Sequence, residues 1–256
     1  MTIPDAILLF LAAVIAGGLN SVAGGGSFFS FPALLLTGVP AITANATSTV
    51  AVWPGSVASA FAYRRRVPHS ARVMAPLTLA SFAGGLLGAG LLLHTKQSTF
   101  MRLIPFLFFA ATLLFAFGKR ISRAIGSHGK QPLQPSWPAL GAVSLVQFSI
   151  AIYGGYFGGG MGILMLAFLT LLPLGDVHAT NGVKALLAAS TNGIAIVAFV
   201  MARRVLWPQA TLMLTGSILG GYGGAHYAQK VNPSLVRVFV VVTGLIMSTY
   251  FLWKYH

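Results

Sequence analysis

Long apolar runs, separated by short polar and basic segments, make up most of this chain. A helix that crosses a membrane needs about 20 apolar residues. Basic residues cluster between the runs, as at 64–66 and 203–204. The pattern predicts an all-α protein that crosses a membrane several times. Helices are expected over the runs of suitable length, at 44–63, 73–93, 99–117, 180–201, 209–228 and 233–254.

Two further regions, 5–37 and 139–172, have a different pattern. Each holds an apolar run, three consecutive glycines and a second run of about 10 to 12 residues. A helix of 12 residues is about 18 Å long, well short of the roughly 30 Å hydrocarbon core. Glycine costs about 1 kcal/mol relative to alanine within a helix. We therefore expect a break in the helix at 24–26 and at 158–160.

The two broken regions also resemble each other. The segment "AGGGSFFSFPALLLTGVPAITANATSTVA" aligns with "FGGGMGILMLAFLTLLPLGDVHATNGVKA", at a spacing of 134 residues for the glycines and 136 for Asn45 and Asn181. Such internal repeats are typical of transporters. We predict a first membrane repeat at 1–118, a basic cytoplasmic linker at 119–137 and a second membrane repeat at 138–256. Together they give about eight transmembrane helices in two homologous four-helix repeats, each with a glycine-broken first helix.

Composition agrees with a membrane protein. Hydrophobic residues make up 56% of the chain and charged residues 7%, with a mean hydropathy of +0.84, whereas soluble domains are about 25% charged. The first apolar run has no basic segment before it, so we expect a retained span and not a cleaved signal. Sixteen Lys and Arg residues against two acids give a net charge of +14. Positive-inside orientation and contact with membrane lipid explain this excess without a nucleic-acid partner.

The basic loops suggest how the halves are oriented. If each broken region crosses the membrane once, both termini and the loops at 64–66 and 203–204 are cytoplasmic. Eleven of the sixteen basic residues then lie on that side, and the halves are parallel. Counting each broken region as two crossings gives five spans per repeat and inverts the halves. The tally favours the parallel arrangement, and half-helices that dip in and return are the alternative.

The glycine breaks are candidate sites for an anion. Irregular backbone at membrane depth is tolerated only where it is buried in protein or lines a wet cavity. The N-terminus of the second half-helix carries about half a positive charge, and glycines let an anion approach its amides. Close helix packing is the alternative, which we favour for Gly84/Gly88 and Gly220/Gly224. The candidate substrate-binding residues at the breaks are Gly24, Gly25, Gly26, Ser27, Gly158, Gly159 and Gly160.

Polar residues follow each break by about twenty positions. We add Asn45, Thr47, Ser48, Asn181 and Lys184 to the candidate substrate site. Asn45 or Thr47 could instead cap a helix. An ionisable group inside the bilayer is a functional hypothesis by default, which makes Lys184 the strongest single candidate. Snorkelling of Lys184 to the interface, or its pairing with the acid at 176, is the alternative.

Several activities lack the residues that they need. No carboxylate lies within a span, and no metalloprotease, nucleophile-elbow or P-loop motif occurs. We therefore expect no enzyme activity, no cofactor and no metal. The chain has no cysteine, which excludes disulfides. His178, expected in a loop, is a secondary candidate for proton coupling.

The stretch "NSVAGGGSFFSFPALLLTGVPAITANATSTVAVWPGSVASAFAYRR" and its counterpart "GGYFGGGMGILMLAFLTLLPLGDVHATNGVKALLAASTNG" resemble the TauE/SafE family of sulfite exporters and 4-toluene sulfonate uptake permeases. The resemblance extends through all spans. It implies a multi-pass transporter in a bacterial-type inner membrane. Members of the family are linked to sulfite, sulfoacetate and other organic anions.

We therefore predict a secondary transporter of a small anion, most consistent with export of sulfite or an organosulfonate by alternating access. An inside-negative potential favours anion exit by about 2.3 kcal/mol per charge per 100 mV, so export needs no coupling ion. An anion channel of the same architecture, or a non-transporting scaffold or sensor, is the alternative. The expected partners are the anion and membrane lipid, and the sequence leaves a homo-oligomer open.

Overall fold

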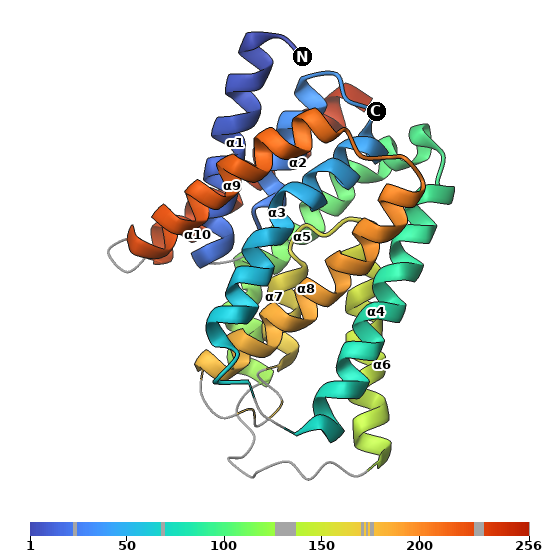
Figure 1. Cartoon of the computed structure of the whole chain (residues 1–256), viewed down its shortest axis with the longest axis vertical. Helices are drawn as coiled ribbons and strands as arrows, with labels where there is room; N and C mark the ends of the chain where they lie inside the picture. The colour runs from blue at the N-terminus through green and yellow to red at the C-terminus, as the bar shows by residue number, and fades with distance from the viewer. Residues whose placement is uncertain are drawn as a thin grey trace.

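The computed structural model describes residues 1–22, 25–67, 70–125, 137–169, 172, 174, 177–227 and 233–255. Within these residues every regular element is an α-helix (Figure 1). The first half contains α1 (Ile3–Val22), α2 (Ser27–Leu36), α3 (Ala41–Tyr63), α4 (Ala71–His94) and α5 (Gln97–Ile125). The second half contains α6 (Trp137–Tyr156), α7 (Met161–Leu169), α8 (Val177–Met201), α9 (Trp207–Tyr227) and α10 (Pro233–Tyr255).

The helices coincide with the predicted apolar runs. The six long runs correspond to α3, α4, α5, α8, α9 and α10. Three stretches of the described helices are long and apolar enough to cross a membrane, at Ile3–Asn20, Ala71–His94 and Ala179–Met201, and shorter apolar stretches lie in four other helices. The prediction of an all-α, multi-pass membrane protein is confirmed.

At each glycine break the chain forms two helices in place of one bent helix. α1 ends before the first break and α2 begins after it, and α6 and α7 flank the second break in the same way. Gly25, Gly158 and Gly160 have φ values of 104°, 78° and 77°, which glycine adopts far more readily than other residues. α2 has 10 residues and α7 has 9, so each is only about 15 Å long. Neither short helix can cross a membrane alone.

The short helices turn back toward the side from which the chain entered. α1 runs parallel to α9, because Gly216 packs against Phe10 and Gly220 against Val14. α9 begins where α3 begins, since the backbone just before α9 donates a hydrogen bond to Thr47 near the start of α3. α1 and α3 therefore start at the same end of the molecule. α2 runs from the middle of the molecule back to that end. α7 returns to the start of α6 in the same way (Figure 1).

Corresponding helices of the two halves run antiparallel. Gly182 at the start of α8 packs against Tyr63 at the end of α3. The Trp53 indole donates a 3.0 Å hydrogen bond to the carbonyl of Ala189 in the middle of the same pair. α5 and α10 are antiparallel as well. This inversion overturns the parallel arrangement that the charge tally favoured, because each short helix dips in and returns.

The inversion also separates the two basic loops. Arg64, Arg65 and Arg66 follow α3 at one end of the molecule, which we call the Arg64 end. Arg203 and Arg204 follow α8 at the other, the Arg203 end. The beginning of α1 and the end of α10 lie at the Arg203 end (Figure 1). The expectation that both loops and both termini share one side is therefore wrong. Most of the predicted linker, residues 126–136, lies outside the described residues.

The two halves exchange packing partners. α1 packs on α9 and α6 packs on α4, while α3 packs on α8 and α5 on α10. Each helix of the first half also begins 134 or 136 residues before one helix of the second. We call two residues at this spacing counterparts: 134 up to the end of α2, and 136 from α3 onward. The duplication and its boundaries stay a prediction, which this exchange of partners supports.

Glycines make the closest helix contacts. A Cβ added at Gly84 would lie 2.5 Å from the carbonyl oxygen of Phe148 in α6, and one at Gly88 would overlap the carbonyl of Ile152. Gly220 packs equally closely on Val14 of α1. The packing interpretation of these glycines is therefore confirmed. The surroundings of Gly224 lie outside the part that the structure describes.

We expect Gly88→Ala to destabilise the protein, because the new methyl group has no room between α4 and α6. Overpacking of this kind costs about 1–3 kcal/mol. Gly90→Ala is a matched control on the same helix, since nothing lies within 4 Å of its added Cβ. The midpoint of thermal unfolding in detergent should fall for Gly88→Ala and stay or rise for Gly90→Ala. Equal midpoints would contradict the close contact.

Candidate functional site

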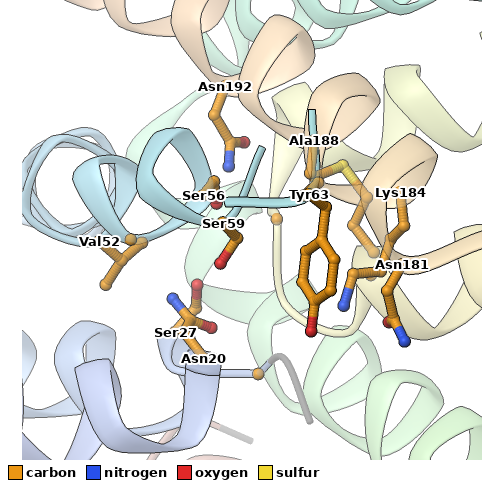
Figure 2. A pocket seen from close by; sticks show the side chains of 16 residues that line it. Asn20, Ser27, Val52, Ser56, Ser59, Tyr63, Asn181, Lys184, Ala188 and Asn192 are labelled. Carbon is orange, nitrogen blue, oxygen red and sulfur yellow. The ribbon is translucent and has the colours of Figure 1, made fainter. Parts of the chain in front are cut away.

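A cavity of about 130 Å³ lies between the two glycine breaks and the crossing of α3 with α8 (Figure 2). On α3 its wall runs from Val52 to Tyr63, and on α8 from Asn192 to Asn181. The cavity therefore extends from the middle of the molecule toward the Arg64 end. Its floor lies next to the Trp53 contact, where α3 and α8 cross.

Five of the predicted site residues line this cavity: Gly25, Ser27, Gly158, Asn181 and Lys184. They come from both halves, and they are up to 159 positions apart in the chain. Figure 2 shows Ser27 on one side and Lys184 with Asn181 across from it. The structure thus brings together one part of each break and the polar start of α8. Gly24 lies outside the described residues.

The remaining glycines of the breaks pack against protein. The backbone N–H of Gly26 donates a 2.8 Å hydrogen bond to the side chain of Asn20, and its added Cβ would lie 2.5 Å from the carbonyl oxygen of Ala16. The carbonyl of Gly159 accepts a 2.6 Å hydrogen bond from the hydroxyl of Tyr153. Gly160 faces Ala111 of α5, with 3.1 Å between its added Cβ and the alanine methyl. These three glycines hold the breaks in shape and do not line the cavity.

Both short helices begin at the cavity. Ser27 is the first residue of α2, and Met161 and Gly162 are the first two of α7; all three are on the wall. The N-terminus of a helix carries roughly half a positive charge from its unpaired amides. Two such ends, one from each half, therefore direct partial positive charge toward the same space. This arrangement favours an anion.

Lys184 adds an ammonium group to this wall. Its side chain extends over the first turn of α7, where its Cδ lies 3.9 Å from the Cβ position of Gly162. Among the described residues on the wall it is the only basic one, and none is acidic. Because Lys184 lines the cavity, it does not reach the outer surface as a snorkelling residue would. The alternative pairing with the acid at 176 lies outside the described residues.

Sequence reasoning missed several polar residues of the wall. They include Asn20 at the end of α1 and Ser56, Ser59 and Tyr63 on α3. Asn192, which lies on the same helix as Lys184, is the counterpart of Ser56. Positions three or four apart share a helix face, so this spacing on α3 was the signal that could have revealed them. Figure 2 shows Ser56 and Ser59 beside each other.

Three predicted site residues lie away from the cavity, buried toward the Arg203 end. Asn45 donates a 3.2 Å hydrogen bond to the carbonyl of Tyr156, and the hydroxyl of Thr47 accepts one of 3.1 Å from the backbone of Leu206. Ser48 shares a 2.7 Å hydrogen bond with Ser30 of α2. None of the three caps α3, because the cap position is Pro40. Their bonds instead join α3 to α2, α6 and the α8–α9 connection.

His178 was expected in a loop but lies in the first turn of α8. Its side chain is outside the described part of the structure. Among the residues that are described, no group of three His, Cys, Asp or Glu side chains could hold a metal ion. The described wall of the cavity presents amides, hydroxyls and one lysine.

Comparison with known proteins agrees with this architecture. The family model described as "Sulfite exporter TauE/SafE" matches residues 9–251. The chain belongs to the TauE/SafE family. Relatives of this TauE/SafE protein include a probable membrane transporter protein, ORF9, from Sinorhizobium sp., which is 32% identical over 94% of this chain and 89% of its own length.

Two further relatives have similar names. A probable membrane transporter protein of Haemophilus influenzae is 29% identical over 94% of this chain and 92% of its own. The probable membrane transporter protein YfcA of Escherichia coli K12 is 27% identical over 97% and 90%. No solved structure matches the chain. The TauE/SafE protein described here is thus a multi-pass membrane transporter.

Proposed function

We propose that this TauE/SafE protein is a secondary transporter that exports a small oxyanion, with sulfite or a short organosulfonate as substrate. The carrying observation is the cavity on which two helix N-termini and Lys184 converge, with no acidic residue on its described wall. In such a site an oxyanion is held by charge-assisted hydrogen bonds, which are about twice as strong as neutral ones. Gly25, Ser27, Gly158, Asn181 and Lys184 are its proposed contacts.

The size of the cavity supports a small substrate. A cavity of about 150 Å³ holds benzene, which has six heavy atoms, and this one measures about 130 Å³. Sulfite has four heavy atoms and fits. Sulfoacetate has eight and would fit only with some expansion, and an aryl sulfonate such as 4-toluene sulfonate is larger still. We therefore expect transport rates to fall in that order.

The charge distribution supports export. The cavity extends toward the Arg64 end, where Arg64, Arg65, Arg66 and Arg72 lie. The positive-inside rule assigns such an end to the cytoplasm. An anion would then enter the cavity from inside, and the potential would favour its exit by about 2.3 kcal/mol per charge per 100 mV. Inverted halves support alternating access, in which each half in turn takes the conformation of the other.

Flux into and out of liposomes tests this proposal. Purified protein is reconstituted, a membrane potential is imposed, and uptake of sulfite, sulfoacetate, 4-toluene sulfonate and acetate is measured. We expect saturable, potential-dependent sulfite flux with counterflow, and the slowest sulfonate flux for the aryl compound. Flux that neither saturates nor shows counterflow would indicate a channel. No flux of any anion from folded protein would favour a scaffold.

A further inference from the structure

The two halves match in fold but differ in the residues along the path through the molecule. The cavity wall contains Ser59, Tyr63 and Lys184. Their counterparts are Ala195, Phe199 and Ser48, which lie on the side toward the Arg203 end. These three are 1%, 0% and 2% exposed. One side of the crossing of α3 and α8 is thus polar and open, and the other is buried.

Aromatic packing closes the buried side. Phe28 of α2 is the counterpart of Gly162, so a ring occupies the place where the cavity side has no side chain. Phe31 packs against the rings of Phe108 and Phe157, with centroids 5.9 and 5.8 Å apart. Phe28 meets Phe108 edge-on at 5.4 Å. All of these rings belong to one buried cluster that also contains Ala195 and Phe199. We call this cluster the aromatic seal.

The asymmetry concerns charge as well as size. On the cavity side the described wall carries one lysine, whereas the corresponding position beside the aromatic seal is Ser48, already hydrogen-bonded to Ser30. Arg203 and Arg204 at the far end are exposed to solvent. Salt screens exposed charges over about 8 Å at physiological ionic strength. A charge inside a cleft with low-dielectric walls acts more strongly on a nearby ion.

We infer that Lys184 is a one-sided selectivity residue, which selects anions only as they enter from the Arg64 end. The cavity is therefore an anion-selecting vestibule, and the route past the aromatic seal has no equivalent charge among the residues that the structure describes. The direction of transport in this inference rests on the proposed function. The selection of charge in the vestibule does not depend on the proposed function. A transporter built this way should bind its anion more tightly from the Arg64 side than from the Arg203 side.

Cysteine labelling tests the selection of charge without any transport. The chain has no cysteine of its own, so Ser59→Cys and Ala195→Cys each create a single thiol at counterpart positions. Small methanethiosulfonates of negative and positive charge are applied to folded protein in detergent. We expect Ser59→Cys to react at least tenfold faster than Ala195→Cys. We also expect the ratio of anionic to cationic labelling rates to be higher at Ser59→Cys than for a free thiol in solution.

Lys184 is then varied in the Ser59→Cys background. Lys184→Ser should lower the ratio of anionic to cationic labelling at least fivefold, and Lys184→Arg should keep it. Lys254→Ser is the control, because Lys254 is an exposed lysine on α10. A ratio that does not change with Lys184→Ser would overturn the inference, as would equal labelling of the two counterpart positions.

Sidedness is measured in liposomes containing protein of one orientation. The Michaelis constant for sulfite should be at least fivefold lower from the Arg64 side, and Lys184→Ser should remove most of that difference. Flux with equal constants on both sides would overturn the sidedness while leaving the proposed function intact. Charge-selective labelling without any flux would support the anion-selecting vestibule and contradict the proposed transport activity.

Discussion

Lys184→Gln is expected to lower potential-driven sulfite flux by about tenfold to a hundredfold. Glutamine keeps a hydrogen-bond donor of similar length but removes the positive charge. A hydrogen bond to a charged group contributes about 1.5–3 kcal/mol, and each 1.4 kcal/mol corresponds to a factor of ten. Because Lys184 is the only basic residue on the described wall, no neighbour on that wall replaces its charge. Initial rates in liposomes, normalised to the amount of folded protein, give the measurement.

The control for this variant is Lys254→Gln. Lys254 is exposed at the end of α10, where its amine lies 5.4 Å from the centre of the Tyr250 ring, far along the chain from either glycine break. The Lys254→Gln variant removes the same charge from the protein as Lys184→Gln does. Any effect of net charge on reconstitution is therefore common to both variants. Flux should be unchanged. If Lys184→Gln also retained full flux while remaining folded, lysine would have no part in the binding of the anion.

Gly158→Ala should reduce sulfite flux about tenfold in protein that still folds. Gly158 has a φ of 78°, so a side chain there costs about 1–2 kcal/mol of backbone strain. Its added methyl group meets only the carbonyl of Gly154, at 3.4 Å, so there is room for it. The methyl group would, however, lie on the cavity wall, where it keeps the anion away from the amides at the start of α7.

Gly38→Ala separates these two effects. Gly38 has nearly the same φ, 80°, and nothing lies within 4 Å of its added Cβ. It follows α2 and is not on the cavity wall. Both variants should therefore lose similar stability, as measured by thermal unfolding, but only Gly158→Ala should lose flux. Equal flux losses would mean that strain alone accounts for the effect, and the break would then have no direct contact with the substrate.

The sequence predicts the long helices of this protein well because each of them is an apolar run ended by polar residues. It also identifies both breaks, since three glycines in an apolar segment have a strong local cost in a helix. The direction of the chain after each break depends instead on tertiary contacts. The packing of Gly216 on Phe10, or of Gly182 on Tyr63, leaves no signal in either segment alone. The count of basic residues on each side gave the wrong orientation of the halves. It placed the loops at Arg64 and at Arg203 on the same side, whereas they lie at opposite ends of the molecule.

The candidate site was predicted only in part, because it too depends on contacts between distant segments. Lys184 and Asn181 stand out as polar residues in an apolar helix, and they line the cavity. Asn45 and Ser48 occupy the matching positions of the first half, so the repeat alone assigns them the same role. They lie instead in the closed side of the molecule, where they hydrogen-bond to Tyr156 and Ser30. A repeated sequence predicts equivalent positions, but in this conformation of the inverted halves Asn45 and Ser48 are buried while their counterparts Asn181 and Lys184 line the cavity.

The depth of the cavity also determines where the membrane voltage falls. In the proposed transporter, water and ions would fill the cavity from the Arg64 end and bring that solution to the level of the crossing of α3 and α8. The electric field is then concentrated across the aromatic seal, which spans about half of the hydrocarbon thickness, since α2 is only about 15 Å long. An anion in the cavity would then have crossed little of the field. In the proposed transporter, nearly the whole electrical work would therefore be done in the single step past Phe28 and Phe199.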